Sequence, residues 1–333
     1  MRIGVGLGGD LRDLGALAAR AERAGFESVW CAETSRTAFV QATVAAAATS
    51  TVTVGTAIAL AFPRSPAITA MAARDLAELT GGRFVLGLGS QVKRVNEQRF
   101  SVPFEHPAPK MAEFVEAVRS VLDAFTTGRI DHRGRFYSLT MPPFPGADPP
   151  SAPVPVYVAA VNEGMAEAAG SVADGVLGHP MTSPRWIGEV LRPAAERGAS
   201  GAGRDPSSVS LTTSLILQVS DDRDEAMREA AAQVAFYATT RTYRPVLALH
   251  GFEELQEPIR RAFVRGDHAE MVRLALPMAE VLAVAGTAGE CREKIAAYEG
   301  VADRVILGGA WIGPSPERIT ANQHTILETF GPS

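Results

Sequence analysis

Residues 81–90 read Gly-Gly-Arg-Phe-Val-Leu-Gly-Leu-Gly-Ser, and this stretch decides the fold class. The glycine pair predicts a tight turn, residues 84–88 form an apolar run of strand length, and Gly89 opens the following loop. A continuous apolar run is typical of a strand buried on both faces, as in a parallel sheet. We expect Gly89 to let the backbone approach a bound ligand closely.

Seven further segments have the same apolar character and alternate with amphipathic helices. One such helix begins after Asp10, and another covers residues 111–125. The additional strands are expected at residues 3–7, 28–32, 52–58, 154–159, 174–178, 211–219 and 303–307. Eight strands alternating with helices predict an α/β protein, a single (β/α)8 TIM barrel over residues 1–333.

A doubly wound dinucleotide-binding sheet is the main alternative. Gly4, Gly6 and Gly9 have the G-x-G-x-x-G spacing of that fold. However, Gly4 and Gly6 lie inside the first expected strand and not after it, and only Glu33 could serve as the acidic residue after the second strand. The barrel is therefore the favoured interpretation.

Two intervals are too long for simple strand–helix units, so we expect insertions after strand 4 and between strands 7 and 8. The first contains a hairpin at residues 130–137 and a proline-rich crossing at 142–155. The second, residues 221–285, is expected to be mostly helical, with breaks at Pro245, Pro258 and Pro277. Such a segment serves as a lid or specificity element, or as surface or dimer-contact structure.

Composition excludes several classes of protein. The net charge is −5 and no basic cluster is interleaved with aromatic residues, which argues against nucleic-acid binding. Cys31 and Cys291 are too few for a disulfide framework, and the six histidines form no metal-binding pair. No signal peptide and no run of ~20 apolar residues is visible, so we expect no membrane association and a cytoplasmic location.

Several polar residues follow the ends of expected strands, where a barrel has its active site. Glu33 would point into the barrel mouth, where burial suits a carboxyl group to proton handling; helix capping is the alternative. Ser90, Gln91, Asn96 and Glu97 follow strand 4 and offer donors for a heterocycle or a phosphate, or form an ordinary solvated loop. His179 follows strand 6 and either donates to a ligand or makes a structural hydrogen bond.

The chain resembles the luciferase-like monooxygenase superfamily, in particular its coenzyme F420-dependent oxidoreductases. The resemblance runs in order along nearly the whole chain. It rests on residues 25–30, 55–57 with Pro63 and Pro66, 81–89, 102–104, 154–160, 173–175 and 286–291.

The resemblance implies a deazaflavin ring held at the carboxyl ends of the strands. It also implies a non-prolyl cis peptide at Ala57–Ile58 behind the ring and a phosphate at a helix beginning near Asn162. An acidic–histidine pair of the family falls on Glu33-Thr34, so the histidine is missing here. The implied cofactor-binding residues are Thr34, Ala57, Ile58, Gly89, Ser90, Gln91, Asn96, Ala160, Val161, Asn162, Glu163, Gly164 and Met165.

The expected activity is hydride transfer between coenzyme F420 and an unidentified small organic substrate. Glu33 is the first candidate for proton transfer, and Glu97 and His179 are weaker ones. An FMN-dependent monooxygenase that uses reduced flavin and oxygen is one alternative, and a non-catalytic flavin-binding protein is another. The resemblance also suggests a homodimer.

Overall fold

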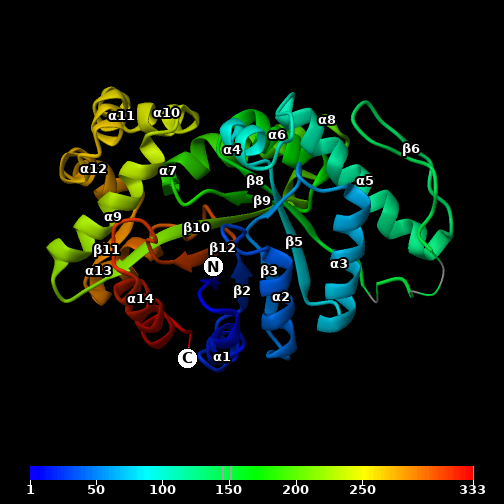
Figure 1. Ribbon diagram of the computed structural model, residues 1–333, viewed down its shortest axis with the longest axis horizontal. Helices are drawn as coiled ribbons and strands as arrows, with labels where there is room; N and C mark the ends of the chain where they lie inside the picture. The colour runs from blue at the N-terminus through cyan, green and yellow to red at the C-terminus, as the bar shows by residue number, and fades with distance from the viewer. Residues whose placement is uncertain (145, 147, 151, 333) are drawn as a thin grey trace.

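The computed structural model describes residues 1–144, 146, 148–150 and 152–332. Within them, eight parallel strands pair side by side in a barrel, which confirms the expected (β/α)8 fold (Figure 1). Strand β12 pairs with both β1 and β10, and β10 pairs with β9, so the ring of strands is closed. The barrel strands are β1 (Arg2–Leu7), β2 (Ser28–Cys31), β3 (Thr53–Thr56), β5 (Phe84–Gly89), β8 (Val156–Ala160), β9 (Gly175–Gly178), β10 (Ser210–Val219) and β12 (Arg304–Gly308).

Helices surround the barrel and bury its outer face. Local signals start and stop them as expected: Asp10 accepts a hydrogen bond from the Arg12 amide at 2.9 Å, and Gly128 ends its helix with a φ of 65°. The surrounding helices are α1 (Leu11–Arg23), α2 (Ala38–Ala47), α3 (Pro66–Thr80), α5 (Pro107–Thr127), α6 (Glu163–Val172), α8 (Arg192–Gly201), α13 (Ala288–Ala296) and α14 (Pro316–Thr329).

The barrel interior is filled by large side chains, with glycines opposite them. Trp30, Val85, Tyr157, Leu177 and Ile306 pack together there. A Cβ atom at Gly55 would lie 2.4 Å from the Trp30 ring, and one at Gly175 would lie 2.9 Å from the Tyr157 ring. The glycines on these strands therefore make room for an aromatic core.

The amino end of the barrel is closed by an ion pair between a buried arginine and a partly exposed glutamate. Arg304 is 3% exposed and contacts both carboxylate oxygens of Glu27, at 2.8 and 2.7 Å. Its guanidinium group lies 5.6 Å from the centre of the Trp30 ring. The interior is thus solid at this end, and ligand access is left to the opposite one.

Both expected insertions are present. After β5 come α4 (Lys93–Arg99), α5 and a hairpin of β6 (His132–Arg133) with β7 (Ser138–Leu139), two residues later than expected. The proline-rich crossing at 142–155 includes residues 145, 147 and 151, which lie outside the described residues.

The second insertion leaves the end of β10 and consists mainly of α9 (Arg223–Ala238), α10 (Arg244–Leu249), α11 (Gln256–Arg265) and α12 (His268–Leu282). It returns through β11 (Val284–Gly286), which pairs in parallel with the end of β10, Val219 opposite Gly286. Ser220 donates its amide to the Gly286 carbonyl at 3.1 Å, so the helical segment is closed at its base.

The structure corrects three details of the sequence analysis. The expected third strand at 52–58 is divided into β3 and β4 (Ala59–Leu60), because the chain bulges between them. Strand β11 lies inside the range expected to be helical; three residues are too few to give a recognisable apolar run. Pro277 does not break a helix but lies inside α12, and Pro258 lies in the first turns of α11.

Candidate functional site

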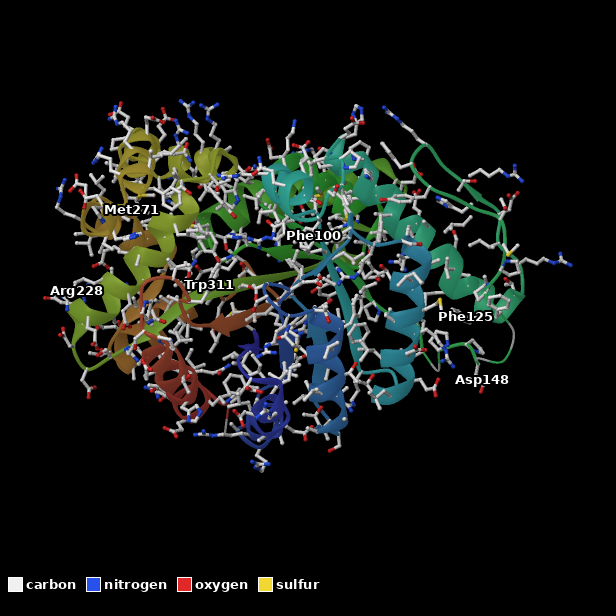
Figure 2. The ribbon with its side chains drawn as sticks, viewed as in Figure 1. Phe100, Phe125, Asp148, Arg228, Met271 and Trp311 are labelled. Carbon is white, nitrogen blue, oxygen red and sulfur yellow. The ribbon has the colours of Figure 1, made fainter. Side chains whose placement is uncertain are left out.

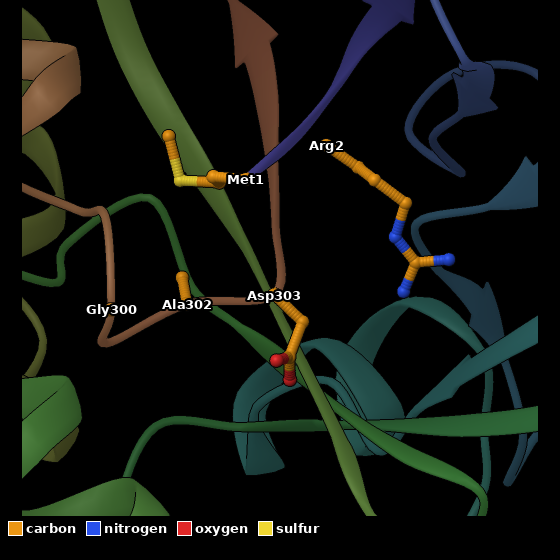
Figure 3. Close-up of a pocket in the computed structure, with 5 residues that line it drawn as sticks. All are labelled: Met1, Arg2, Gly300, Ala302 and Asp303. Atoms are coloured by element: carbon orange, nitrogen blue, oxygen red, sulfur yellow. The ribbon is translucent and has the colours of Figure 1, made fainter.

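The carboxyl ends of the barrel strands form a mouth that faces α4, α7 (Pro184–Trp186) and the helical segment. Figure 1 shows α4, α10 and α11 on one side of the barrel, opposite α1, α2 and α14. A separate shallow pocket, shown in Figure 3, is lined by Met1, Arg2, Gly300, Ala302 and Asp303. These residues lie at the amino ends of β1 and β12, whereas barrel enzymes work at the carboxyl ends, so the mouth is the candidate site.

The floor of the mouth is formed where β3 gives way to β4. The Ala57–Ile58 peptide bond is cis, as the family resemblance implied. Ile58 lies against the barrel core, and a Cβ atom at Gly89 would come within 2.0 Å of the Ile58 Cδ1 atom. Gly89 therefore makes room for the Ile58 side chain, and its expected close approach to a ligand stays a prediction.

The Glu33 carboxylate is held in place by hydrogen bonds to both of its oxygens. One oxygen accepts from the Leu60 amide at 2.7 Å and from Arg64 Nη1 at 2.7 Å, and the other pairs with Arg64 Nη2. The Glu33 amide also donates to the Ile58 carbonyl at 3.1 Å. The side chain is only 8% exposed. A carboxylate held on both oxygens by the Arg64 guanidinium group and the Leu60 amide fixes the bulge, which favours a positioning role over proton transfer.

The neighbouring candidates at this edge lie closer to solvent. Thr34 is exposed just beyond β2. Glu97 is 42% exposed on α4 and lies 3.7 Å from Lys93, one helical turn away. The geometry thus gives Glu97 an ordinary surface ion pair.

The loop after β5 is organised by Asn96. This buried side chain donates through Nδ2 to the carbonyls of Ser90 and Val92, at 2.8 and 3.1 Å. Gln91 has a positive φ of 58°, and its side chain accepts from the Val92 amide at 3.0 Å. Ser90 is half-buried and donates to the Gln91 carbonyl at 3.2 Å. Asn96 therefore shapes the loop, and its Oδ1 atom is buried without a partner among the described residues.

Strand β8 ends in small residues and leads directly into α6. Asn162 precedes the helix, but its side chain does not cap it; Nδ2 donates instead to the Thr242 carbonyl at 2.9 Å. Its Oδ1 atom is buried without a partner among the described residues. A Cβ atom at Gly164 would meet nothing within 4 Å, and Glu163 points to Arg197 at 3.1 Å. Among the described residues, the first amides of α6 therefore have no side-chain partner.

The residue before Asn162 is also fixed: the Val161 carbonyl accepts from Trp186 Nε1 at 3.0 Å. Ala160 is buried and Met165 is half-buried. These contacts, with the Thr242 bond, tie the end of β8 to α7 and to the helical segment.

His179 lies at the end of β9 and meets aromatic residues of the helical segment. Its Nδ1 atom accepts from the Met181 amide at 3.1 Å, and its Nε2 atom is 2.9 Å from the Tyr243 hydroxyl. Its ring packs edge-on to Tyr237, with ring centres 4.6 Å apart. Burial lowers the pKa of His179 to about 3 and raises the pKa of Tyr243. His179 is therefore neutral at ordinary pH.

Tyr237, Tyr243 and Trp311 were missed by the sequence analysis. The ring centre of Trp311 lies 5.6 Å from that of Phe236 on α9. Trp311 is 48% exposed and lies between α9 and the barrel (Figure 2). The paired aromatics at 236–237 were a usable signal, but aromatic residues in a helical stretch more often belong to a core. Arg64 was missed as well, because nothing in the sequence links it to Glu33.

The described residues contain no group of three or more histidine, cysteine or acidic side chains that could hold a metal ion. None of the helices in the described ranges is long and apolar enough to cross a membrane.

Comparison with known proteins gives a consistent result. Residues 2–304 match the family model for luciferase-like monooxygenases. An uncharacterized protein of Mycobacterium tuberculosis is 40% identical over 296 residues, 86% of each chain. The F420-dependent glucose-6-phosphate dehydrogenase of Kineococcus radiotolerans is 28% identical and is matched over 87% of this chain and 83% of its own.

Among solved structures, the coenzyme F420-dependent tetrahydromethanopterin reductase of Methanopyrus kandleri superimposes with a TM-score of 0.82. The match covers 98% of this chain and 97% of that one at 23% identity, which supports the fold. The chain therefore belongs to the luciferase-like monooxygenase family and is an oxidoreductase.

Proposed function

We propose that this protein is an F420-dependent oxidoreductase that moves a hydride between the deazaflavin and a small organic substrate. The observation that carries the proposal is the match over 87% of the chain to an enzyme that is F420-dependent by name. The residues at the mouth agree with it, because the floor at Ile58 is apolar and β8 ends in small residues, as a flat ring requires. When bound, the deazaflavin supplies the carbon that gives or takes the hydride.

The residues at the mouth fit such a cofactor in two ways. The uncapped amides of α6 and the open position at Gly164 suit an anionic group, because a helix amino terminus attracts negative charge. The Oδ1 atoms of Asn96 and Asn162 are buried and have no partner in the described part of the chain, so they are acceptors available to a hydroxyl or N–H group. The proposed binding residues are Thr34, Ala57, Ile58, Gly89, Ser90, Gln91, Asn96, Ala160, Val161, Asn162, Glu163, Gly164 and Met165.

The three candidates for proton transfer, Glu33, Glu97 and His179, have different roles in this proposal. Glu33 holds the bulge beneath the ring through Arg64 and the Leu60 amide. Glu97, in its surface pair with Lys93, is left at the rim. His179 lies at a strand end beside the helical segment, where a substrate would enter.

The test is equilibrium binding of F420 and of FMN to the purified protein, followed by quenching of cofactor fluorescence. F420 should bind at least about tenfold more tightly, a difference of about 1.4 kcal/mol. Equal or tighter FMN binding would favour a flavin-dependent monooxygenase instead. F420 binding without turnover of any substrate would favour a non-catalytic binding protein.

The proposal includes a homodimer, in which α2 and α3 form the contact. Helix α2 contains no charged residue, and Val40, Ile68 and Met71 are 49%, 59% and 46% exposed on these neighbouring helices. Light scattering should give twice the chain mass of 35.2 kDa.

A cytoplasmic location is also proposed, because Cys31 and Cys291 are both unpaired, as in proteins of a reducing compartment.

A further inference from the structure

The pair formed by His179 and Tyr243 has a defined direction of hydrogen bonding. The Met181 amide can only donate, so the Nδ1 atom that accepts from it at 3.1 Å carries no proton. The neutral ring then has its proton on Nε2, which donates to the Tyr243 hydroxyl oxygen at 2.9 Å. Protonation of Nδ1 would set two N–H groups against each other, so the same geometry disfavours the imidazolium form.

The consequence falls on the hydroxyl proton of Tyr243. Its oxygen already accepts from His179, and the proton has no acceptor elsewhere in the part of the chain that the structure describes. Tyr243 is 7% exposed, so little water is available to it. A buried donor without an acceptor is costly to a fold, and an acceptor on a ligand relieves that cost.

The surroundings of this donor are aromatic and uncharged. Tyr237 packs against His179, and its ring centre lies 5.8 Å from that of Tyr243. Tyr237 also adjoins Phe236, which packs edge-on to Trp311. Among the described residues, no arginine, lysine, aspartate or glutamate side chain forms a hydrogen bond or ion pair with His179, Tyr237, Tyr243 or Trp311. Such a wall suits an uncharged molecule with one acceptor oxygen and is a poor site for a phosphate or carboxylate.

We propose that Tyr243, positioned by His179, donates to the oxygen of an uncharged carbonyl compound, or of the alcohol it becomes, and that this is the substrate class. The inference rests on the proposed function for the source of the hydride. The bound, reduced deazaflavin would supply the hydride that the carbonyl carbon gains and would itself be oxidised, and the π electron pair would move to oxygen. The oxygen takes the phenol proton, and His179 Nε2–H stabilises the Tyr243 oxyanion that remains; a proton from solvent returns to Tyr243 when the alcohol leaves and water enters its place.

The experiment uses the cofactor-free protein and three ketones labelled with ¹³C at the carbonyl: acetone, cyclohexanone and acetophenone. At least one should bind with its carbonyl ¹³C resonance and C=O stretch displaced in the direction of hydrogen bonding. In Tyr243→Phe the displacement should vanish and binding should weaken about 3- to 10-fold. The matched control Tyr237→Phe, from the same cluster, should keep the displacement.

Three results would overturn the inference: no displacement with any of the ketones, an unchanged displacement in Tyr243→Phe, or tighter binding of glucose 6-phosphate than of the ketones. Thermal unfolding of each variant checks that it is folded. Should Tyr243→Phe not fold, ¹⁵N NMR of the histidines in the unaltered protein decides, because a proton on Nδ1 of His179 would refute the geometry.

The ketone and tautomer measurements need no cofactor. A negative result in them can therefore be told apart from a negative result in the F420 titration. In that titration Tyr243→Phe should bind F420 as tightly as the unaltered protein does.

Discussion

Substitution of Gly89 by alanine tests why a glycine ends β5. The added Cβ atom would lie 2.0 Å from Ile58 Cδ1, 3.0 Å from Cγ1 and 3.3 Å from Cβ. Overpacking of this kind costs about 1–3 kcal/mol of unfolding free energy. Ile58→Ala in the same chain removes Cγ1 and Cδ1 and leaves only the 3.3 Å contact, so most of that loss should be recovered in the double variant.

The measurement is a double-mutant cycle by urea unfolding followed by circular dichroism. We expect Gly89→Ala and Ile58→Ala to couple by about 1–3 kcal/mol, well above the ~0.5 kcal/mol scatter of independent sites. Gly8→Ala is the control, since a Cβ atom there meets nothing within 4 Å. Additive single effects, or a Gly89→Ala variant as stable as the control, would show that Ile58 is not what requires glycine at this position.

Two further predictions concern buried ionisable groups. His179 has a folded-state pKa of about 3 against an ordinary 6.5, so the unfolded chain binds the extra proton between these values. Its contribution makes the unfolding free energy fall as pH falls through that window, by up to about 1.4 kcal/mol per pH unit. Urea unfolding at pH 7.5, 6 and 5 should show this slope reduced in His179→Phe, and an identical slope would contradict the assignment. Glu33→Gln leaves Arg64 without its anionic partner and should cost about 3 kcal/mol, the lower end for a broken buried pair, because Arg64 is 21% exposed. In the same unfolding assay the double variant Glu33→Gln/Arg64→Gln should recover part of that unfolding free energy. An unchanged unfolding free energy in Glu33→Gln would refute the stabilising role of the Glu33–Arg64 pair.

The sequence was sufficient for the barrel because buried parallel strands appear as continuous apolar runs. The same signal is lost in β4 and β11, which have two and three residues. The positions of candidate site residues followed from the strand ends, as His179 at the end of β9 illustrates. Their partners did not: Arg64 meets Glu33 across 31 residues and Tyr243 meets His179 across 64. Such pairings depend on how the loops fold over the mouth, which no local pattern encodes.

The closed base of the helical segment bears on how this enzyme could diversify. The chain leaves the barrel at Ser220 and returns at Gly286, and those two residues are joined by a 3.1 Å backbone hydrogen bond. Because the junction is fixed, the cost of replacing the intervening helices by a segment of another length grows only slowly with that length. The segment that carries Tyr237 and Tyr243 can therefore be exchanged as a unit. On the role proposed for Tyr243, exchange of this segment between relatives would alter the substrate while the barrel and the floor at Ile58 stay intact, which is a direct route to new activities on one scaffold.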